Sequence, residues 1–162
     1  YQVRVGVTEP KTEHIGTASA VVNIPDLKSK KLNLSSLQLA DGALLKETPD
    51  STAQSHTVQG IRFFPRKQPI VYITRLYQTA NSANKPEDLE MQTEIWQGEK
   101  NLVKGDWIPL VPRVLERDTK GLTIGGQYVL NEFPTGIFEL RLQVRVKGKK
   151  SGVTRVAVFG ME

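Results

Sequence analysis

The chain has 162 residues, of which 38% are hydrophobic and 24% are charged, a balance typical of a globular domain rather than a disordered segment. Its formal net charge is +5, but the basic residues are dispersed along the chain, which argues against a nucleic-acid-binding protein. No run reaches the roughly 18 apolar residues of a membrane helix, so no membrane-spanning segment is expected. The absence of cysteine excludes disulfides, thiolate metal ligands and a cysteine nucleophile.

The N-terminal segment has the alternation of a half-buried strand. In residues 1–7 an aromatic residue and three valines occupy the odd positions, while Gln2 and Arg4 occupy the polar side. A turn is expected at residues 9–13, followed by a second strand over 17–24. These signals predict a β-hairpin.

The next segment, residues 26–31, is expected to be a linker, because it follows Pro25 and combines small polar residues with a run of charge. A strand is predicted over residues 31–40. Its leucines change phase across Ser35 and Ser36, which predicts a β-bulge that bends the strand between two sheets. Residues 41–56 form the longest expected loop.

The remainder of the chain is predicted to form further short strands. Residues 70–77 are apolar on both faces, which favours a central strand, whereas 89–97 have their odd positions facing inward. No window shows a helical period, so we expect an all-β protein: an antiparallel β-sandwich of the immunoglobulin or fibronectin type III kind with an extra N-terminal hairpin. The further strands are expected at 58–64, 70–78, 89–97, 107–111, 122–130, 138–146 and 153–159.

The two ends of the chain carry similar hairpins. Residues 1–7 match residues 138–144 position by position, with Arg4 matching Arg141, and Gly16 and Gly152 each precede a second strand. This match indicates a duplication. We therefore expect residues 1–25 to be the last hairpin of a preceding similar domain, 26–31 a linker, and 32–162 a complete sandwich. Because a lone hairpin cannot bury its apolar face, it is expected to dock on its own sandwich or to self-associate with another copy.

Several motifs resemble those of large acidobacterial proteins described as VWFA-related, in the region that follows their von Willebrand factor A domain. The resemblance covers nearly the whole chain, and its motifs are structural rather than catalytic. They are Tyr1-Gln2-Val3-Arg4-Val5, Gly16-Thr17-Ala18-Ser19-Ala20, residues 22–27, residues 32–39, Arg62-Phe63-Phe64-Pro65 and residues 134–140.

The resemblance implies Ig-like modules of a larger bacterial protein that is exported from the cytoplasm, either to the periplasm or outside the cell. The metal-binding Asp-x-Ser-x-Ser of the A domain is absent, because residues 50–54 lack both serines at the required spacing. Phe138 stands where the family often has a tyrosine, so a tyrosine-corner hydroxyl is lacking.

The residues give little support to catalysis or metal binding. The two histidines, His14 and His56, lie in a predicted turn and a predicted loop, too few and too far apart for a zinc site or a Ser-His-Asp arrangement with Ser55. Glu90 and Glu94 share one strand face at about 13 Å, beyond the spacing of glycosidase carboxylates; they are expected to form an exposed charged edge. Residues 121–126 lack the lysine and helix of a phosphate-binding loop.

Exposed aromatic residues suggest where a ligand would bind. Trp96 lies on the polar side of its strand and, with Trp107, Tyr72 or Tyr77, is the candidate platform for a sugar ring or a peptide. The competing interpretation is that Trp96 packs beneath a loop or against the preceding hairpin.

Basic residues on the strands suggest further contacts. Arg141 and Arg145, like Arg4, are expected to point outward and pair with glutamates across the sheet. The densest basic cluster, residues 147–150, is interpreted as a solvated turn.

We therefore expect a non-enzymatic structural and interaction module that needs no cofactor or metal and contacts neighbouring domains of the same protein. The alternative is a carbohydrate- or peptide-binding sandwich that uses the exposed aromatic residues. The two differ in whether Trp96 is needed for binding a ligand.

Overall fold

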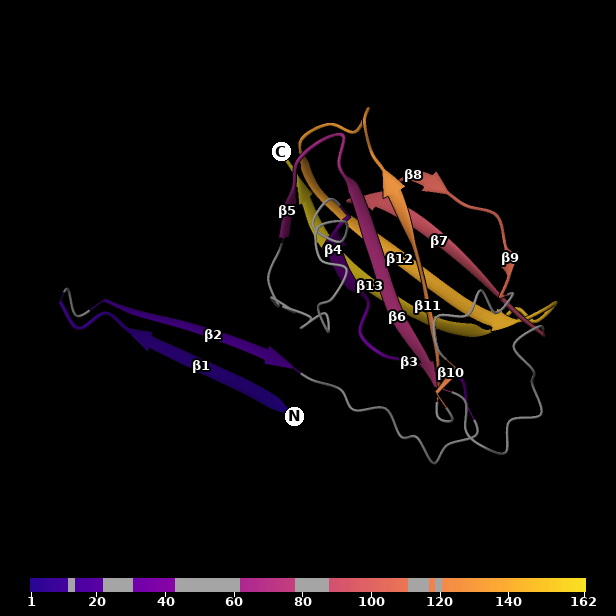
Figure 1. Ribbon diagram of the computed structural model, residues 1–162, viewed down its shortest axis with the longest axis horizontal. Helices are drawn as coiled ribbons and strands as arrows, with labels where there is room; N and C mark the ends of the chain where they lie inside the picture. Colours follow the sequence, from indigo (N-terminus) through magenta and orange to yellow (C-terminus); the bar gives the residue numbers. More distant parts are fainter. Residues whose placement is uncertain (12–13, 22–30, 43–61, 78–87, 111–116, 119–120) are drawn as a thin grey trace.

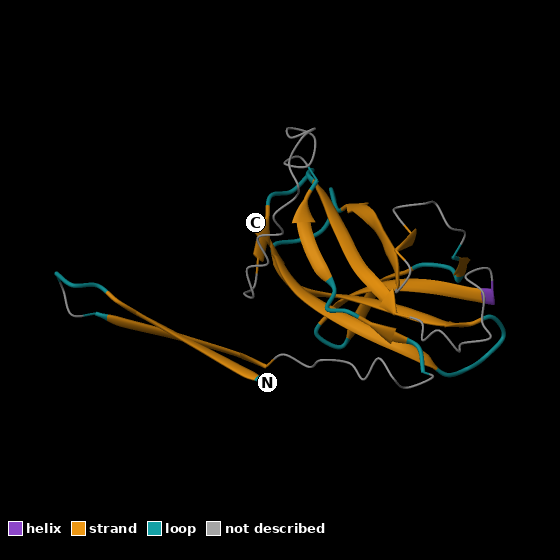
Figure 2. Cartoon of the chain, turned by 60° about the horizontal axis from the view of Figure 1, so that its bottom comes forward, coloured by secondary structure: helices purple, strands orange, loops and turns teal. Residues whose placement is uncertain are grey.

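The computed structural model describes residues 1–11, 14–21, 31–42, 62–77, 88–110, 117–118 and 121–162. Within these ranges every element is a strand, apart from one 3₁₀-helical residue at Asp88. The strands form a two-stranded hairpin and two larger sheets (Figure 1). The sheets lie face to face as a sandwich, which confirms the predicted all-β fold (Figure 2). No helix in these ranges has the length and hydropathy needed to cross a membrane.

The smaller sheet of the sandwich is centred on one long strand. β6 (Pro69–Tyr77) pairs antiparallel with β11 (Gly121–Val129) on one side. On its other side it pairs with two short strands, β3 (Asn33–Leu34) and β4 (Gln38–Asp41). β10 (Arg117–Asp118) lies beyond β11. The central place of β6 explains its apolar residues on both faces, as the sequence predicts.

The larger sheet has the order β5-β13-β12-β7-β8, with β9 also paired to β7. β12 and β13 form the C-terminal hairpin, β12 pairs antiparallel with β7, and β5 joins β13 in parallel. The strands are β5 (Arg62–Phe64), β7 (Leu89–Gln97), β8 (Lys100–Lys104), β9 (Ile108–Pro109), β12 (Gly136–Val146) and β13 (Gly152–Met161).

The core forms because each strand sends alternate side chains into the space between the sheets. In β12 the residues Phe138, Leu140, Leu142 and Val144 are each at most 2% exposed, and the residues between them are half-buried. Phe138 stacks on Phe159 of β13 with ring centres 5.6 Å apart. The alternation in the sequence therefore identifies the buried face of this strand correctly.

The N-terminal hairpin consists of β1 (Gln2–Thr8) and β2 (Ile15–Val21), which pair only with each other in the described residues. It stands apart from both sheets in the two views (Figures 1 and 2). Its apolar side is open to solvent, since Tyr1 is 84% exposed and Val7 65% exposed. The predicted hairpin is confirmed, with its apolar face uncovered.

Three details differ from the sequence predictions. The segment predicted as one bulged strand between two sheets forms β3 and β4, which pair with the same strand, β6, in one sheet. β8 and β10 are absent from the predicted strands. β7 is not an exposed edge, because β12 pairs on one side and β8 with β9 on the other. The predicted strand positions 22–24, 58–61, 78 and 111, residues 26–30 of the predicted linker, and residues 43–56 of the predicted loop lie outside the described residues.

Candidate functional site: the outer face of the larger sheet

The outer face of the larger sheet carries most of the aromatic and charged side chains that the sequence singles out. We call the following group the Trp–Arg face: Glu90, Glu94, Trp96, Trp107, Glu139, Arg141 and Arg145. Its members come from β7, from β12 and from the segment between β8 and β9. Alternation positions the strand residues of this group, because they occupy the alternate positions of β7 and β12 that point away from the core between the sheets.

At one end of this face Arg141 lies over the ring of Trp96, with its guanidinium carbon 4.4 Å from the ring centre. Arg141 also donates two hydrogen bonds, of 3.0 and 2.7 Å, to the carboxylate of Glu139 two residues earlier. The indole nitrogen of Trp96 donates a 2.8 Å hydrogen bond to Glu94. A cation above an aromatic face and a charge-assisted pair hold these side chains in one arrangement.

At the other end Arg145 lies over Trp107, with its guanidinium carbon 3.5 Å from the ring centre. The Nε of Arg145 donates a 2.7 Å hydrogen bond to Glu90, directly opposite on β7. Only 11% of the Glu90 side chain and 22% of the Arg145 side chain are exposed. This cross-strand pairing of arginine with glutamate follows the sequence prediction for Arg145. The prediction is wrong for Arg141, which pairs with Glu139 of its own strand, and for Arg4, which hydrogen-bonds Gln2 of its own strand. Glu90 is buried rather than on an exposed edge.

A local irregularity in the pairing lies beside Trp96. The register between β7 and β8 shifts by one residue between Ile95 and Trp96. Such a bulge increases the local twist and redirects a side chain. Lys104 of β8 also reaches Glu94, with 3.5 Å between Nζ and Oε1. Because β8 was not predicted, Lys104 is a member of this neighbourhood that the sequence analysis missed.

The structure brings Trp96 and Trp107 onto this face and places the two candidate tyrosines elsewhere. Tyr72 lies in the core at 6% exposure and stacks on Tyr128 at 5.8 Å between ring centres. Tyr77 is half-buried on the smaller sheet, with Arg75 6.0 Å above its ring centre. The four candidate aromatic residues therefore do not form one surface.

Tyr72 belongs to a small polar cluster inside the sandwich. Burial is the main reason that the pKa of Tyr72 is raised above 10.0, the neighbouring Tyr128 raises it further, and a hydrogen bond from Thr93 lowers it. Thr93 of β7 also shares a short hydrogen bond with the Tyr128 hydroxyl of β11. These hydroxyl groups link the two sheets across the core.

An apolar patch lies beside the Trp–Arg face. Val156 and Val158 of β13 are 49% and 41% exposed, and Val158 lies opposite Glu139 in the sheet. The ring of Phe63 lies over Gly160, where an added Cβ would come within 2.4 Å of it. The larger sheet thus presents apolar and ionic strips side by side on one face.

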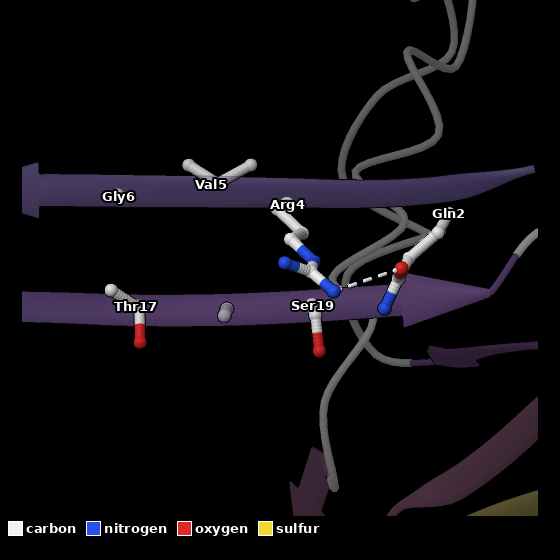
Figure 3. Close-up of a pocket in the computed structure, with 7 residues that line it drawn as sticks. Gln2, Arg4, Val5, Gly6, Thr17 and Ser19 are labelled. Carbon is white, nitrogen blue, oxygen red and sulfur yellow. Dashed lines mark hydrogen bonds between the residues drawn. The ribbon is translucent and has the colours of Figure 1, made fainter.

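The hairpin carries a hollow on the side of Arg4. Its lining residues include Gln2, Gly6, Thr17 and Ser19, and Gly6 leaves space because it has no side chain (Figure 3). Arg4 extends over β2 and donates a 3.1 Å hydrogen bond to the Gln2 amide oxygen. Val5 and Ala18 also belong to the lining, so one cation, neutral polar groups and small apolar side chains surround this hollow.

The described residues contain no group of three His, Asp or Glu side chains placed to hold a metal ion. His14 is exposed beside the hairpin turn, and the predicted position of His56 lies outside the described residues. Each glutamate of the Trp–Arg face has a basic partner: Arg145 for Glu90, Arg141 for Glu139, and Lys104, beside the face, for Glu94. The chain matches no protein-family model and no curated protein.

Proposed function

We propose that the chain is a non-catalytic structural and interaction module of a larger, extracytoplasmic bacterial protein built from Ig-like sandwiches in series. In this proposal residues 1–25 close a preceding sandwich, 26–31 link the two, and 32–162 form a complete sandwich. The neighbouring domains of the same protein are its partners. The bacterial source and the location outside the cytoplasm rest on the resemblance described above.

One observation carries the proposal: the two hairpins have the same register. Gln2 pairs with Val21, and Glu139 pairs with Val158. Each residue of the first pair therefore lies 137 positions before its counterpart in the second pair. The displacement persists along the ladder, where Thr8 pairs with Ile15 and Arg145 pairs with Gly152. The two glycines of the sequence comparison differ by one position: Gly16 corresponds to Val153 rather than to Gly152.

The side chains of the two hairpins also correspond. Arg4 hydrogen-bonds Gln2 two residues earlier, as Arg141 hydrogen-bonds Glu139. The burial of their apolar faces is opposite: Val5 is 55% exposed, whereas its counterpart Leu142 is fully buried. A hairpin with the pattern of a sandwich strand pair and an uncovered apolar face supports the proposal that a second sandwich covers it.

The proposal is tested by supplying that second sandwich. In a tandem variant, residues 31–137 are joined directly to Tyr1 of the full chain, so that Tyr1 takes the place that Phe138 holds in β12. Amide hydrogen exchange of β1 is measured in this variant and in the original chain. We expect the β1 amides to be protected in the tandem variant and to exchange quickly in the original chain.

A matched control carries Tyr1→Phe, Val3→Leu and Val5→Leu in the same tandem variant, which restores the core side chains of β12. Protection of β1 in this control but not in the tandem variant would show that the native hairpin does not close a sandwich of this kind. The proposal would then be wrong.

Self-association of two copies through the hairpin is the alternative way in which the same apolar face could be covered. Light scattering of the original chain after size-exclusion chromatography separates the two. A dimer that Val3→Asp with Val5→Asp converts to a monomer would favour self-association, and a monomer at all concentrations would favour a cover from the same protein.

A second candidate function rests on Trp96 and Trp107, which share the outer face of the larger sheet. A carbohydrate or an extended peptide binds such rings by stacking. An arginine lies over one face of each ring, so a ligand has to use the other face or displace the arginine. A glycan array with the original chain and with Trp96→Ala tests this candidate; absence of binding by both would exclude glycans as its ligands.

A further inference from the structure

β1 and β12 differ in the number of strands that pair with them. β12 lies between β13 and β7, whereas β1 pairs with β2 alone within the described residues. Since β1–β2 has the register of β12–β13, the edge of β1 that faces away from β2 corresponds to the edge of β12 that β7 covers. An uncovered edge presents unpaired backbone groups to which another strand can add.

The pairing of β12 with β7 shows what such a strand brings. Glu94 lies directly opposite Arg141, and Trp96 lies opposite Glu139. The ring of Trp96 thereby comes under the guanidinium of Arg141 at 4.4 Å, and the indole nitrogen is held by Glu94. The pattern on β7 that faces Arg141 of β12 is therefore an acidic residue followed two positions later by an aromatic residue.

The corresponding position on β1 has the arginine without these two groups. Arg4 is exposed and reaches over β2 to Gln2, with the hollow beside it (Figure 3). Its contacts with described residues include neither a carboxylate nor an aromatic ring. An exposed guanidinium is complementary to a ring and to a negative charge.

We propose that the free edge of β1, Gln2–Thr8, accepts an antiparallel strand that places an acidic residue opposite Arg4 and an aromatic residue opposite Gln2. This inference rests on the proposed function, and it specifies the partner: a strand equivalent to β7 from a preceding sandwich of the same protein. The aromatic ring lies against Arg4 as Trp96 lies against Arg141. The acid lies opposite Arg4 as Glu94 lies opposite Arg141, and it supplies the negative charge that Glu139 gives to Arg141 and that Gln2 lacks.

The experiment is a double-mutant cycle in the tandem variant, which carries one added copy of Trp96 and the original one. Arg4→Ala is combined with Trp96→Leu in the added copy, and the unfolding equilibrium constant of the added sandwich is measured by hydrogen exchange of β1. We expect the two changes to be coupled by about two- to fivefold in that constant, the range of a cation–π contact near the surface. The matched control combines Arg4→Ala with Trp96→Leu in the original copy, for which we expect no coupling.

A second readout is the nuclear magnetic resonance signal of the Arg4 side chain. In the tandem variant we expect its Cδ protons to shift upfield, because they lie over an indole ring, and to return when Trp96 of the added copy is replaced by leucine. Protected β1 amides without coupling or shift would overturn this inference and leave the proposed function standing. Unprotected β1 amides beside a protected control would overturn both.

Discussion

The guanidinium group of Arg145 lies over the ring of Trp107 on the outer side of the larger sheet, with 3.5 Å between the guanidinium carbon and the ring centre. The contact joins β12 to the segment between β8 and β9, which is also held to β7 by hydrogen bonds of Gly105 with Thr93 and Gln92. Glu90 completes the arrangement from β7, and its side chain is only 11% exposed. Arg145 therefore neutralises the negative charge of a carboxylate that has little access to water.

Replacing Arg145 by alanine is expected to lower the free energy of unfolding by about 2–4 kcal/mol, because Glu90 is left largely buried without its counter-charge. Urea denaturation measures the change. The control is Arg141→Ala, whose ion pair with Glu139 is more than a third exposed on both sides and whose loss should cost about 1 kcal/mol. Equal losses would show that the burial of Glu90 does not matter.

Stability is expected to fall as the pH rises above about 10, in part because of Tyr72. Its pKa is raised in the folded chain by burial and by Tyr128, so the unfolded chain loses the phenol proton first. The contribution of this group is complete below the unfolded pKa and is lost as the pH climbs toward the folded one. Urea denaturation at a series of pH values should give a shallower fall for Tyr72→Phe than for the original chain, and an unchanged slope would contradict this assignment.

Gly125→Ala is expected to destabilise the sandwich by about 1–3 kcal/mol, because the added Cβ would lie 2.4 Å from the backbone oxygen of Tyr72 on the paired strand. Gly6→Ala in β1 is the matched control, since nothing lies within 4 Å of its added Cβ. The control should leave stability within about 0.5 kcal/mol of the original. Thermal unfolding of both variants checks the difference. An unchanged stability of Gly125→Ala would mean that β11 can shift away from β6.

Val5 and Leu142 occupy corresponding positions of the two hairpins in opposite surroundings. Leu142→Ala is expected to lower the unfolding free energy by about 2–5 kcal/mol, because it leaves a cavity in the core. Val5→Ala in the original chain should change it by less than about 0.5 kcal/mol, since Val5 is half exposed. A large loss from Val5→Ala, measured by urea denaturation, would show that the apolar face of the hairpin is covered in solution.

Much of the fold could be predicted from local pattern. Alternation in residues 138–146 identifies both the strand and its buried face, because a strand reverses side-chain direction at every residue. The apolar character of 70–77 predicts the central place of β6, and the match of the two ends predicts hairpins of the same kind. Trp96 is placed correctly on the polar side of its strand for the same reason.

Partners in space could not be predicted in this way, because strand pairing joins residues that are far apart in the chain. The pairing of β12 with β7 brings Arg145 to Glu90, and only then does Glu90 become a buried, neutralised carboxylate. Tyr72 looks like a surface aromatic in the sequence but faces the core, since β6 lies between two other strands and packs against the opposite sheet.

The sequence by itself determined that this protein is all-β, which face of most strands is buried, and that its ends carry related hairpins, because these features depend on periodicity between near neighbours. Only the tertiary structure decided the order of the strands, the stacking of arginines on Trp96 and Trp107, and the shared register of the two hairpins. The strand order and the stacking depend on pairing between segments far apart in the chain. The register of each hairpin depends on how its turn aligns the two strands, where a shift of one residue exchanges the buried and exposed faces.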